Sequence, residues 1–200
     1  YMTYSKTASQ TLYNRVMPQA NISLLGNKVL EGRTLAGDEF YFTIKANNDA
    51  PLYQNGNKVS EITVQNDAKG NFTFTGLRYT EADIGKTYTY TITEKVPQNS
   101  ANGIVYDTTA HTVSVVVSQD SADGPLTLTV KNGETVLNAA NGVYALNAAD
   151  AATFTNIYKA AGSFKVTGTK KLNRPISGGE FQVVMTEATE AFAPITGGKP

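Results

Sequence analysis

The sequence of 200 residues contains no cysteine, no tryptophan and a single histidine, His111. Without cysteine there is no disulfide, no thiol nucleophile and no cysteine-ligated metal. One histidine gives no basis for a histidine-ligated zinc site or a histidine-based catalytic triad. These absences argue against most of the familiar classes of catalytic site, and we expect neither a metal nor a cofactor.

The chain also lacks an excess of either charge, because 17 Lys and Arg residues balance 17 Asp and Glu residues. Such a chain offers no field that would attract nucleic acid or an anionic membrane. No apolar run is long enough to cross a bilayer, and residues 1–10 do not have the pattern of a signal peptide. We therefore expect no nucleic-acid partner and no membrane insertion of this segment.

What the chain does have is a series of short segments in which apolar and polar residues alternate, which is the pattern of half-buried β-strands. Residues that favour turns separate these segments, and the one helix-like stretch, 138–152, is interrupted by Asn and Gly. One helical turn is expected at 80–85, with Thr80 as its N-cap. The expected strands are 21–30, 39–46, 60–65, 70–77, 85–96, 110–119, 125–133 and 152–159. Many short strands without helical crossovers predict an all-β fold, an antiparallel sandwich or barrel.

An internal similarity links the two ends of the chain. When residues 11–40 are set above 153–181, Asn14 falls on Asn156 and Lys28 on Lys170, and the order Asn, Gly, Lys, Leu, Arg, Gly, Glu-Phe is kept. The simplest interpretation is a tandem array of repeats with truncated neighbours. A chance resemblance between two strand–linker–strand segments is the alternative.

The repeat predicts three parts. Residues 1–17 would be the last strand of a preceding repeat, 18–159 a complete domain, and 160–200 the incomplete N-terminal part of a following repeat. Such a fragment would expose unpaired strand edges at both ends.

Three polar side chains are predicted to face the interior of the central domain. In strand 85–96, Glu94 is in phase with apolar residues, and Lys28 and Asn156 are in phase with apolar residues on the first and last strands. Each has an ordinary structural explanation, since a lysine can reach water from a strand end, an Asn can serve a turn and a Glu can sit at a rim. A buried ion pair would satisfy Lys28 and Glu94 but would leave the Asn unexplained.

A chemical interpretation accounts for all three residues. Desolvation lowers the pKa of a lysine and raises that of a glutamate, so a dry pocket can hold a neutral amine beside a protonated carboxyl. The amine of Lys28 would be the nucleophile, the carboxamide carbon of Asn156 the electrophile, and Glu94 the proton shuttle. The product would be an intramolecular isopeptide bond with release of ammonia.

At these residues the sequence resembles the isopeptide-forming domains of Gram-positive surface pilins and adhesins, of the pilin isopeptide-linkage type related to CnaB. The matching stretches are "KVLEGRTLAGDEFYF", "YTYTITE", "GIVYDTTAHTVSVVV" and "FTNIY". The resemblance implies an Ig-like or CnaB-like β-sandwich, with the cross-link at Lys28 and Asn156 and the assisting role at Glu94. It also implies that Asn14 and Lys170 are half-sites of neighbouring repeats. His111 departs from the pattern, where an aromatic such as Tyr is expected, and should not touch the chemistry.

The resemblance implies a structural role in a pilus shaft or adhesin stalk on the cell wall of a Gram-positive bacterium. Implied partners are neighbouring repeats, sortase, other pilin subunits and a host surface ligand, although the chain carries no sorting motif. The main alternative is a module that binds a host protein or glycan through exposed aromatics such as Tyr53, Tyr79 or Tyr106. A conventional enzyme ranks third, because the carboxylate pairs at 38–39 and 81–83 fall in turn-like segments, and a turn also explains 120–124 better than calcium does.

Overall fold

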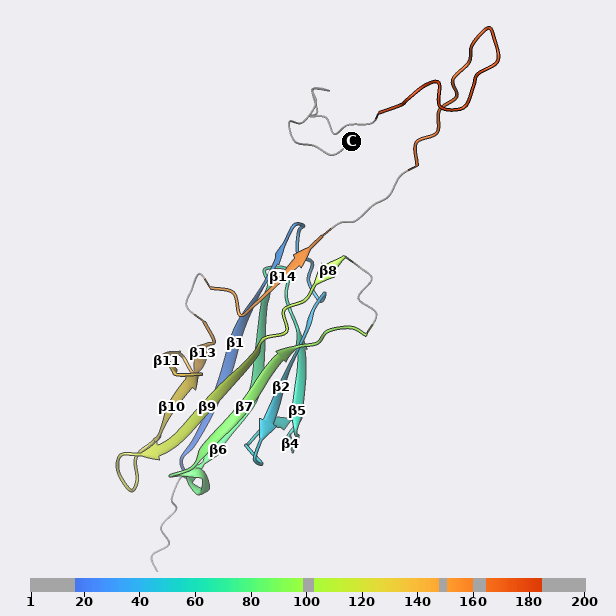
Figure 1. Cartoon of the computed structure of the whole chain (residues 1–200). Coiled ribbons are helices and arrows are strands. Elements are labelled where there is room, and N and C mark those ends of the chain that lie inside the picture. Colours follow the sequence, from blue (N-terminus) through green and yellow to red (C-terminus); the bar gives the residue numbers. More distant parts are fainter. Residues whose placement is uncertain (1–16, 99–102, 148–150, 160–164, 185–200) are drawn as a thin grey trace, which may run out of the picture. The chain divides into compact units, whose positions relative to one another are not determined.

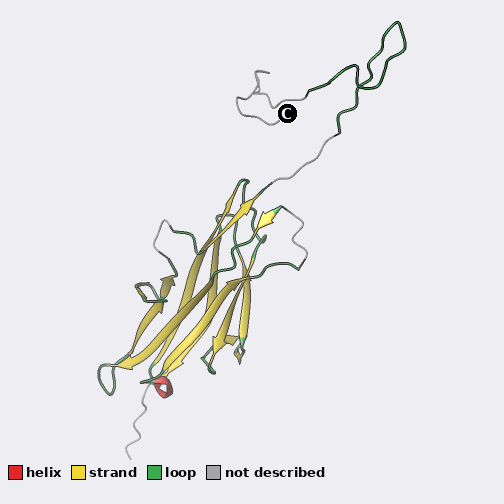
Figure 2. Ribbon diagram, viewed as in Figure 1, coloured by secondary structure: helices red, strands yellow, loops and turns green. Residues whose placement is uncertain are grey.

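The computed structural model describes residues 17–98, 103–147, 151–159 and 165–184. By its internal contacts the chain divides into two compact units, 1–161 and 162–200. The first unit is a sandwich of two β-sheets, as Figure 1 shows, and its only described helix is one short turn (Figure 2). Among the described residues none forms a helix long and apolar enough to cross a membrane.

The strands alternate in burial as their sequences predict. Their bounds are β1 Gln19–Glu31, β2 Tyr41–Asn47, β3 Tyr53–Gln54, β4 Asn57–Lys58, β5 Glu61–Gln65, β6 Asn71–Thr80, β7 Thr87–Glu94, β8 Ile104–Val105, β9 Ala110–Gln119, β10 Leu126–Asn132, β11 Thr135–Leu137, β12 Ala139–Ala140, β13 Val143–Ala145 and β14 Phe154–Tyr158. The 3-10 turn η1 spans Glu81–Asp83, and the backbone N–H of Thr80 donates to the Asp83 carboxylate at 2.7 Å. The all-β sandwich and the capped turn at Thr80 are therefore confirmed.

One sheet has the order β12-β13-β1-β14-β8, with β6 on the other edge of β1, and the second has the order β11-β10-β9-β7-β2-β5. Most neighbours are antiparallel, but β1 runs parallel to both β13 and β14. Parallel neighbours need a long connection between them, and here the connection is nearly the whole domain. The first and last long strands thus lie side by side and point the same way (Figure 1).

The core between the sheets is rich in aromatic rings. Phe42 of β2 stacks on Phe72 of β6 with ring centroids 3.8 Å apart, and Phe154 of β14 lies 5.5 Å from Phe42. The ring of Phe72 lies across Gly26 of β1, in space that the β-carbon of any other residue would occupy. The packing joins the two sheets directly beside the inward polar residues.

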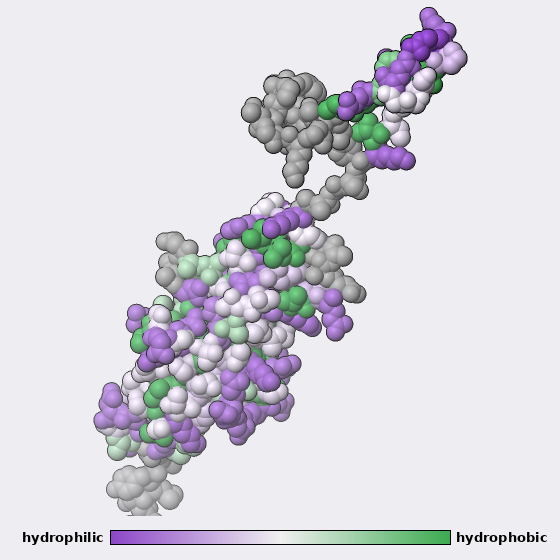
Figure 3. Space-filling view, in the orientation of Figure 1, coloured by the Kyte–Doolittle hydropathy of each residue, from purple (hydrophilic) through white to green (hydrophobic). Residues whose placement is uncertain are grey.

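The second unit is described only at 165–184, where no regular strand is formed and the residues are exposed. On the visible face of the first unit, hydrophilic and hydrophobic residues are interspersed rather than gathered by kind (Figure 3).

Candidate functional site

The three predicted site residues come from two adjacent strands and the facing sheet. In the parallel register of β1 and β14, Lys28 is opposite Phe154, and Leu30 is opposite Asn156. Lys28 and Asn156 are therefore diagonal neighbours on the inward face of one sheet. Glu94, the last residue of β7, enters the same space from the other sheet.

The carboxyl group of Glu94 bridges the other two side chains. Nζ of Lys28 donates to Oε2 of Glu94 at 2.6 Å, and Nδ2 of Asn156 donates to Oε1 at 2.5 Å. One carboxyl thus contacts both the amine and the carboxamide nitrogen, each through a separate oxygen. This is the constellation that strand phase predicted, and the structure brings all three residues together.

The cluster is almost closed to water. The exposed fractions are 1% for Lys28, 5% for Glu94 and 0% for Asn156, and the ring of Phe40 covers Nζ of Lys28 at 4.9 Å from its centroid. Burial lowers the pKa of Lys28 and raises the pKa of Glu94, against the opposing effect of their mutual hydrogen bond. Both shifts favour the neutral amine and the neutral acid over the ion pair.

Asn66 holds Phe40 in place above the lysine. Its Oδ1 accepts from the backbone N–H of Phe40 at 2.8 Å, and its Nδ2 donates to the carbonyls of Ala36 and Asp67. Asn66 is itself 1% exposed, and its bond to Phe40 is made away from bulk water. Its position at the end of β5 gave no sequence signal beyond that of a turn residue.

The carboxamide oxygen of Asn156 has a separate partner that sequence reasoning missed. The backbone N–H of Asp107 donates to Oδ1 of Asn156 at 2.7 Å. The Asp107 carboxylate accepts from the N–H groups of Thr155 and Thr109, at 3.0 and 2.9 Å. Asp107 precedes Thr109 by two residues, which is the spacing of an Asx turn and the one local signal that could have drawn attention to it.

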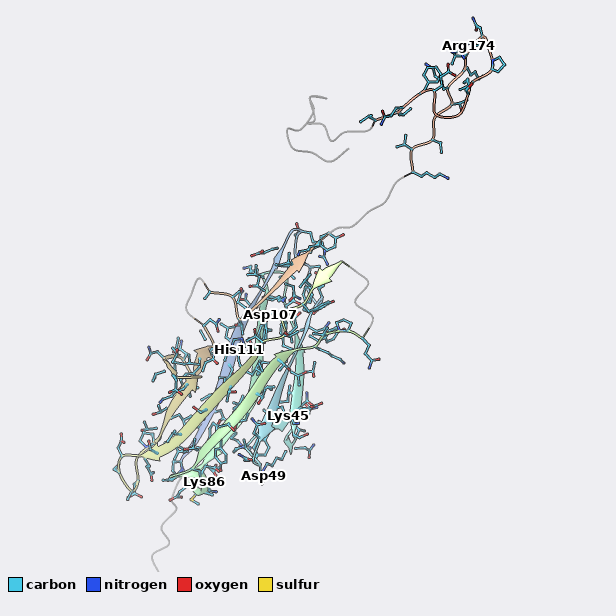
Figure 4. All side chains as sticks on the ribbon, viewed as in Figure 1. Lys45, Asp49, Lys86, Asp107, His111 and Arg174 are labelled. Atoms are coloured by element: carbon cyan, nitrogen blue, oxygen red, sulfur yellow. The ribbon has the colours of Figure 1, made fainter. Side chains whose placement is uncertain are left out.

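His111 lies on the neighbouring strand β9, on the same part of the sandwich as Asp107 (Figure 4). Its Nε2 lies 2.9 Å from the carbonyl oxygen of Thr153, and its ring meets that of Phe154 edge-on at 5.0 Å. Its Nδ1 lies 3.5 Å from Nδ2 of Asn132 on β10, so its described contacts are to the start of β14 and to β10, and not to the three clustered side chains.

Of the two expected half-sites, Asn14 lies outside the described residues and Lys170 is exposed. Lys170 lies over the ring of Phe181 at 4.8 Å, much as Lys28 lies over Phe40. Arg174 pairs with Glu180 (Figure 4 labels Arg174), whose other oxygen accepts from the N–H of Ser177.

The same contacts occur in the connection between β1 and β2, which joins the two sheets of the sandwich. There Arg33 pairs with Glu39, whose other oxygen accepts from the N–H of Ala36, and each arginine also donates to the carbonyl of the residue that follows it. The arginine–glutamate pair, the backbone N–H bond to the glutamate and the arginine bond to a carbonyl therefore recur at aligned positions of the two segments.

Tyr79 was expected among the exposed aromatics, and this prediction is wrong. Tyr79 is fully buried, and its hydroxyl lies 2.9 Å from that of Tyr90. The register of β6 against β1 shifts where Gly76 adopts φ +89°, and this reverses the side-chain phase of the residues beyond it. Tyr53 and Tyr106 are only partly buried.

The acidic segments serve structural purposes in the described residues. Glu39 pairs with Arg33, and the Asp83 carboxylate accepts from Thr80 and from the hydroxyl of Tyr88. Within the described ranges no group of three or more His, Asp or Glu side chains is placed to hold a metal.

The fold is thus a two-sheet sandwich that holds an inward lysine, an inward asparagine and a bridging glutamate in one buried cluster. Residues 24–159 match the family of Spy0128-like isopeptide-containing domains (FctA), and the chain belongs to that family. The resemblance to Gram-positive pilin isopeptide domains is thereby confirmed.

Solved structures similar to the chain include two from Streptococcus pyogenes. The major pilin protein T-13 is 19% identical, with a TM-score of 0.38 over 70% of this chain and 52% of that chain. A second major pilin is 17% identical, with a TM-score of 0.35 over 73% and 51%. The chain spans about half the length of these proteins. No curated protein matches the sequence.

Proposed function

We propose that the central domain forms an intramolecular isopeptide bond between Lys28 and Asn156, assisted by Glu94, and serves as a structural unit of a pilus shaft or adhesin stalk. The observation that carries the proposal is the single buried carboxyl that hydrogen-bonds both the amine and the carboxamide. A buried ion pair alone would not need Asn156 as its second partner.

The reaction exchanges one amide for another. The lone pair of Lys28 Nζ attacks Cγ of Asn156, and the electron pair of the carbonyl moves onto Oδ1. Glu94 accepts a proton from Nζ and delivers one to Nδ2, so that the tetrahedral intermediate collapses with loss of ammonia. Amine and carboxamide become a secondary amide and ammonia, Glu94 is regenerated, and no further reactant is consumed.

The surroundings favour this exchange. The strand register holds the nucleophile and electrophile on one face of one sheet, which removes most of the entropic cost of bringing them together. Exclusion of water lowers the pKa of Lys28 and so favours the neutral, nucleophilic form of the amine. The domain acts once on itself, so the proposal does not include turnover on an external substrate.

The bond would suit a protein that transmits tension. It would close a loop of about 130 residues between the first and last long strands, and this loop closure is worth roughly 5 kcal/mol in the chain-entropy model used for disulfides. The family is one of isopeptide-containing domains, and the similar solved structures are described as major pilins of Streptococcus pyogenes. On this basis the chain is assigned to a Gram-positive cell surface, with sortase, other pilin subunits and a host ligand as partners.

The tandem organisation is part of the same proposal: 1–17 as the end of one repeat, 18–159 as a whole domain and 160–200 as the start of the next. The recurrence of the Arg33–Glu39 contacts at Arg174 and Glu180 supports it. Asn14 and Lys170 would then be half-sites completed by neighbouring repeats.

Intact mass under denaturing conditions tests the bond. We expect the purified chain to lack the mass of one ammonia, and peptide mapping to locate the loss in a branched peptide joining Lys28 to Asn156. Lys28→Ala, Asn156→Ala and Glu94→Ala should each restore the full mass, whereas Lys45→Ala, on the exposed face of β2, should not. An unmodified wild-type mass would contradict the proposal.

A further inference from the structure

When an amine attacks Cγ of Asn156, negative charge develops on the carboxamide oxygen Oδ1. One backbone group donates a hydrogen bond to that oxygen. The backbone N–H of Asp107 donates to Oδ1 at 2.7 Å. Amide hydrogens placed in this way stabilise the oxyanion of acyl-transfer intermediates, and a bond to an anion is stronger than one to a neutral carbonyl.

The side chain of the same residue fixes the position of this donor. One carboxylate oxygen of Asp107 accepts from the N–H of Thr109, which closes the local turn. The other accepts from the N–H of Thr155, the residue directly before the electrophile. Asp107 is therefore tied to β14 at two consecutive residues, through its side chain at 155 and its own N–H at 156.

The carboxylate itself does not contact the reacting atoms. Burial disfavours its charged form, but the hydrogen bonds that it accepts hold the pKa of Asp107 below its usual value. A carboxylate that stays ionised keeps accepting from both N–H groups across the neutral pH range. Its role is thus that of an anchor and not that of a second proton shuttle.

We infer that Asp107 is a positioning residue for the cross-linking reaction: its side chain anchors its own backbone N–H as the oxyanion donor for Asn156. This inference rests on the proposed isopeptide bond. In the balanced step, the carbonyl electron pair that moves onto Oδ1 during attack by Lys28 is stabilised by this N–H, and it returns to re-form the carbonyl as ammonia leaves.

The test uses unreacted full-length chain, purified in denaturant and transferred to native buffer. Ammonia loss is followed by intact mass, and folding is followed separately by near-ultraviolet circular dichroism. We expect Asp107→Ala to fold and to cross-link about 10- to 100-fold more slowly than wild type, because loss of one oxyanion donor costs up to about 100- to 1,000-fold and the loosened N–H retains part of its effect. Asp107→Asn, which keeps one acceptor oxygen, should fall between the two.

Asp83→Ala is the matched control. The Asp83 carboxylate also accepts from a backbone N–H, that of Thr80, and it lies in η1 before the start of β7, whereas Glu94 is the last residue of that strand. It should cross-link at close to the wild-type rate. Equal rates for Asp107→Ala, Asp83→Ala and wild type would overturn the inference and leave the isopeptide proposal intact, whereas a wild type that loses no ammonia would overturn both.

Two further results separate the anchor from other roles. The negative charge of Asp107 could instead act by changing the pKa values of Lys28 and Glu94. In that case Asp107→Asn would cross-link as slowly as Asp107→Ala, and this result would contradict the anchoring role. If Asp107→Ala does not fold, the amide proton of Asp107 is measured by NMR in unreacted Glu94→Ala. Its hydrogen exchange should accelerate when Asn156→Ala is added, and unchanged exchange would refute the contact.

Discussion

Removing the proton shuttle while keeping its shape should separate the stability due to the cross-link from that due to packing. In Glu94→Gln the side chain keeps its size and one acceptor oxygen, but an NH2 donor replaces the second acceptor oxygen and the side chain cannot move a proton. Lys28 and Asn156 then remain unlinked, because the amide exchange needs an acid and a base at the position of Glu94. We expect a folded protein with the full unmodified mass.

The magnitude follows from the loop that the bond closes. A loop of about 130 residues corresponds to roughly 5 kcal/mol of unfolding free energy. For a domain of this size each kcal/mol shifts Tm by about 2–4 °C, so the variant should melt about 10–20 °C below wild type. Differential scanning calorimetry measures this difference directly.

Glu61→Gln is the matched control, since Glu61 is an exposed glutamate at the start of β5. It should keep both the cross-link and the wild-type Tm. The reasoning is refuted if Glu94→Gln still loses ammonia at the wild-type rate, or if it lacks the bond and nevertheless melts within a few degrees of the control.

Three other predictions concern the groups around the site. The cross-linking rate of freshly folded chain should depend on pH with a bell-shaped profile, because the reactive form of the Lys28–Glu94 pair holds one proton. At lower pH a second proton binds and charges the amine, whose pKa is lowered by burial. At higher pH the acid loses its proton, although burial raises the pKa of Glu94. A pH-independent rate would contradict this assignment. Gly26→Ala should destabilise the domain by about 1–3 kcal/mol in denaturant titrations, since a β-carbon there collides with a core ring, whereas Gly168→Ala, which meets no atom within 4 Å, should change nothing. Asn66→Ala should cost about 1–3 kcal/mol for the buried groups it leaves unpaired and should slow cross-linking by loosening the ring above the amine; unchanged stability and rate would contradict its supporting role.

Much of the fold could be predicted from the sequence because period-two alternation is a local signal. In the part of the chain that the structure describes, it located every long strand within a few residues, and it selected Lys28, Glu94 and Asn156 as inward-facing. Alternation fails where the backbone breaks it, and the irregularity at Gly76 explains why Tyr79 was wrongly placed at the surface.

Other features depend on contacts between distant parts of the chain. The parallel pairing of β1 with β14 is set by how the whole domain closes, which no local pattern encodes. The contact of Asp107 with Asn156 is made by a backbone N–H, and side-chain chemistry therefore gives no sign of it. The aligned motifs did predict a relation between the β1–β2 connection and the segment around 174–180, and their similar side-chain contacts are consistent with it.

The parallel pairing of β1 and β14 has a consequence for how the rest of the domain can change. With a bond between Lys28 and Asn156, tension would travel from Gln19 along β1, cross to β14 and leave at Tyr158, a path of about a dozen residues or roughly 40 Å of strand. Every hairpin between these strands would be a side branch that carries no load. Insertions, deletions and substitutions in those loops could then accumulate, and with them a changing surface, without weakening the path that bears the tension.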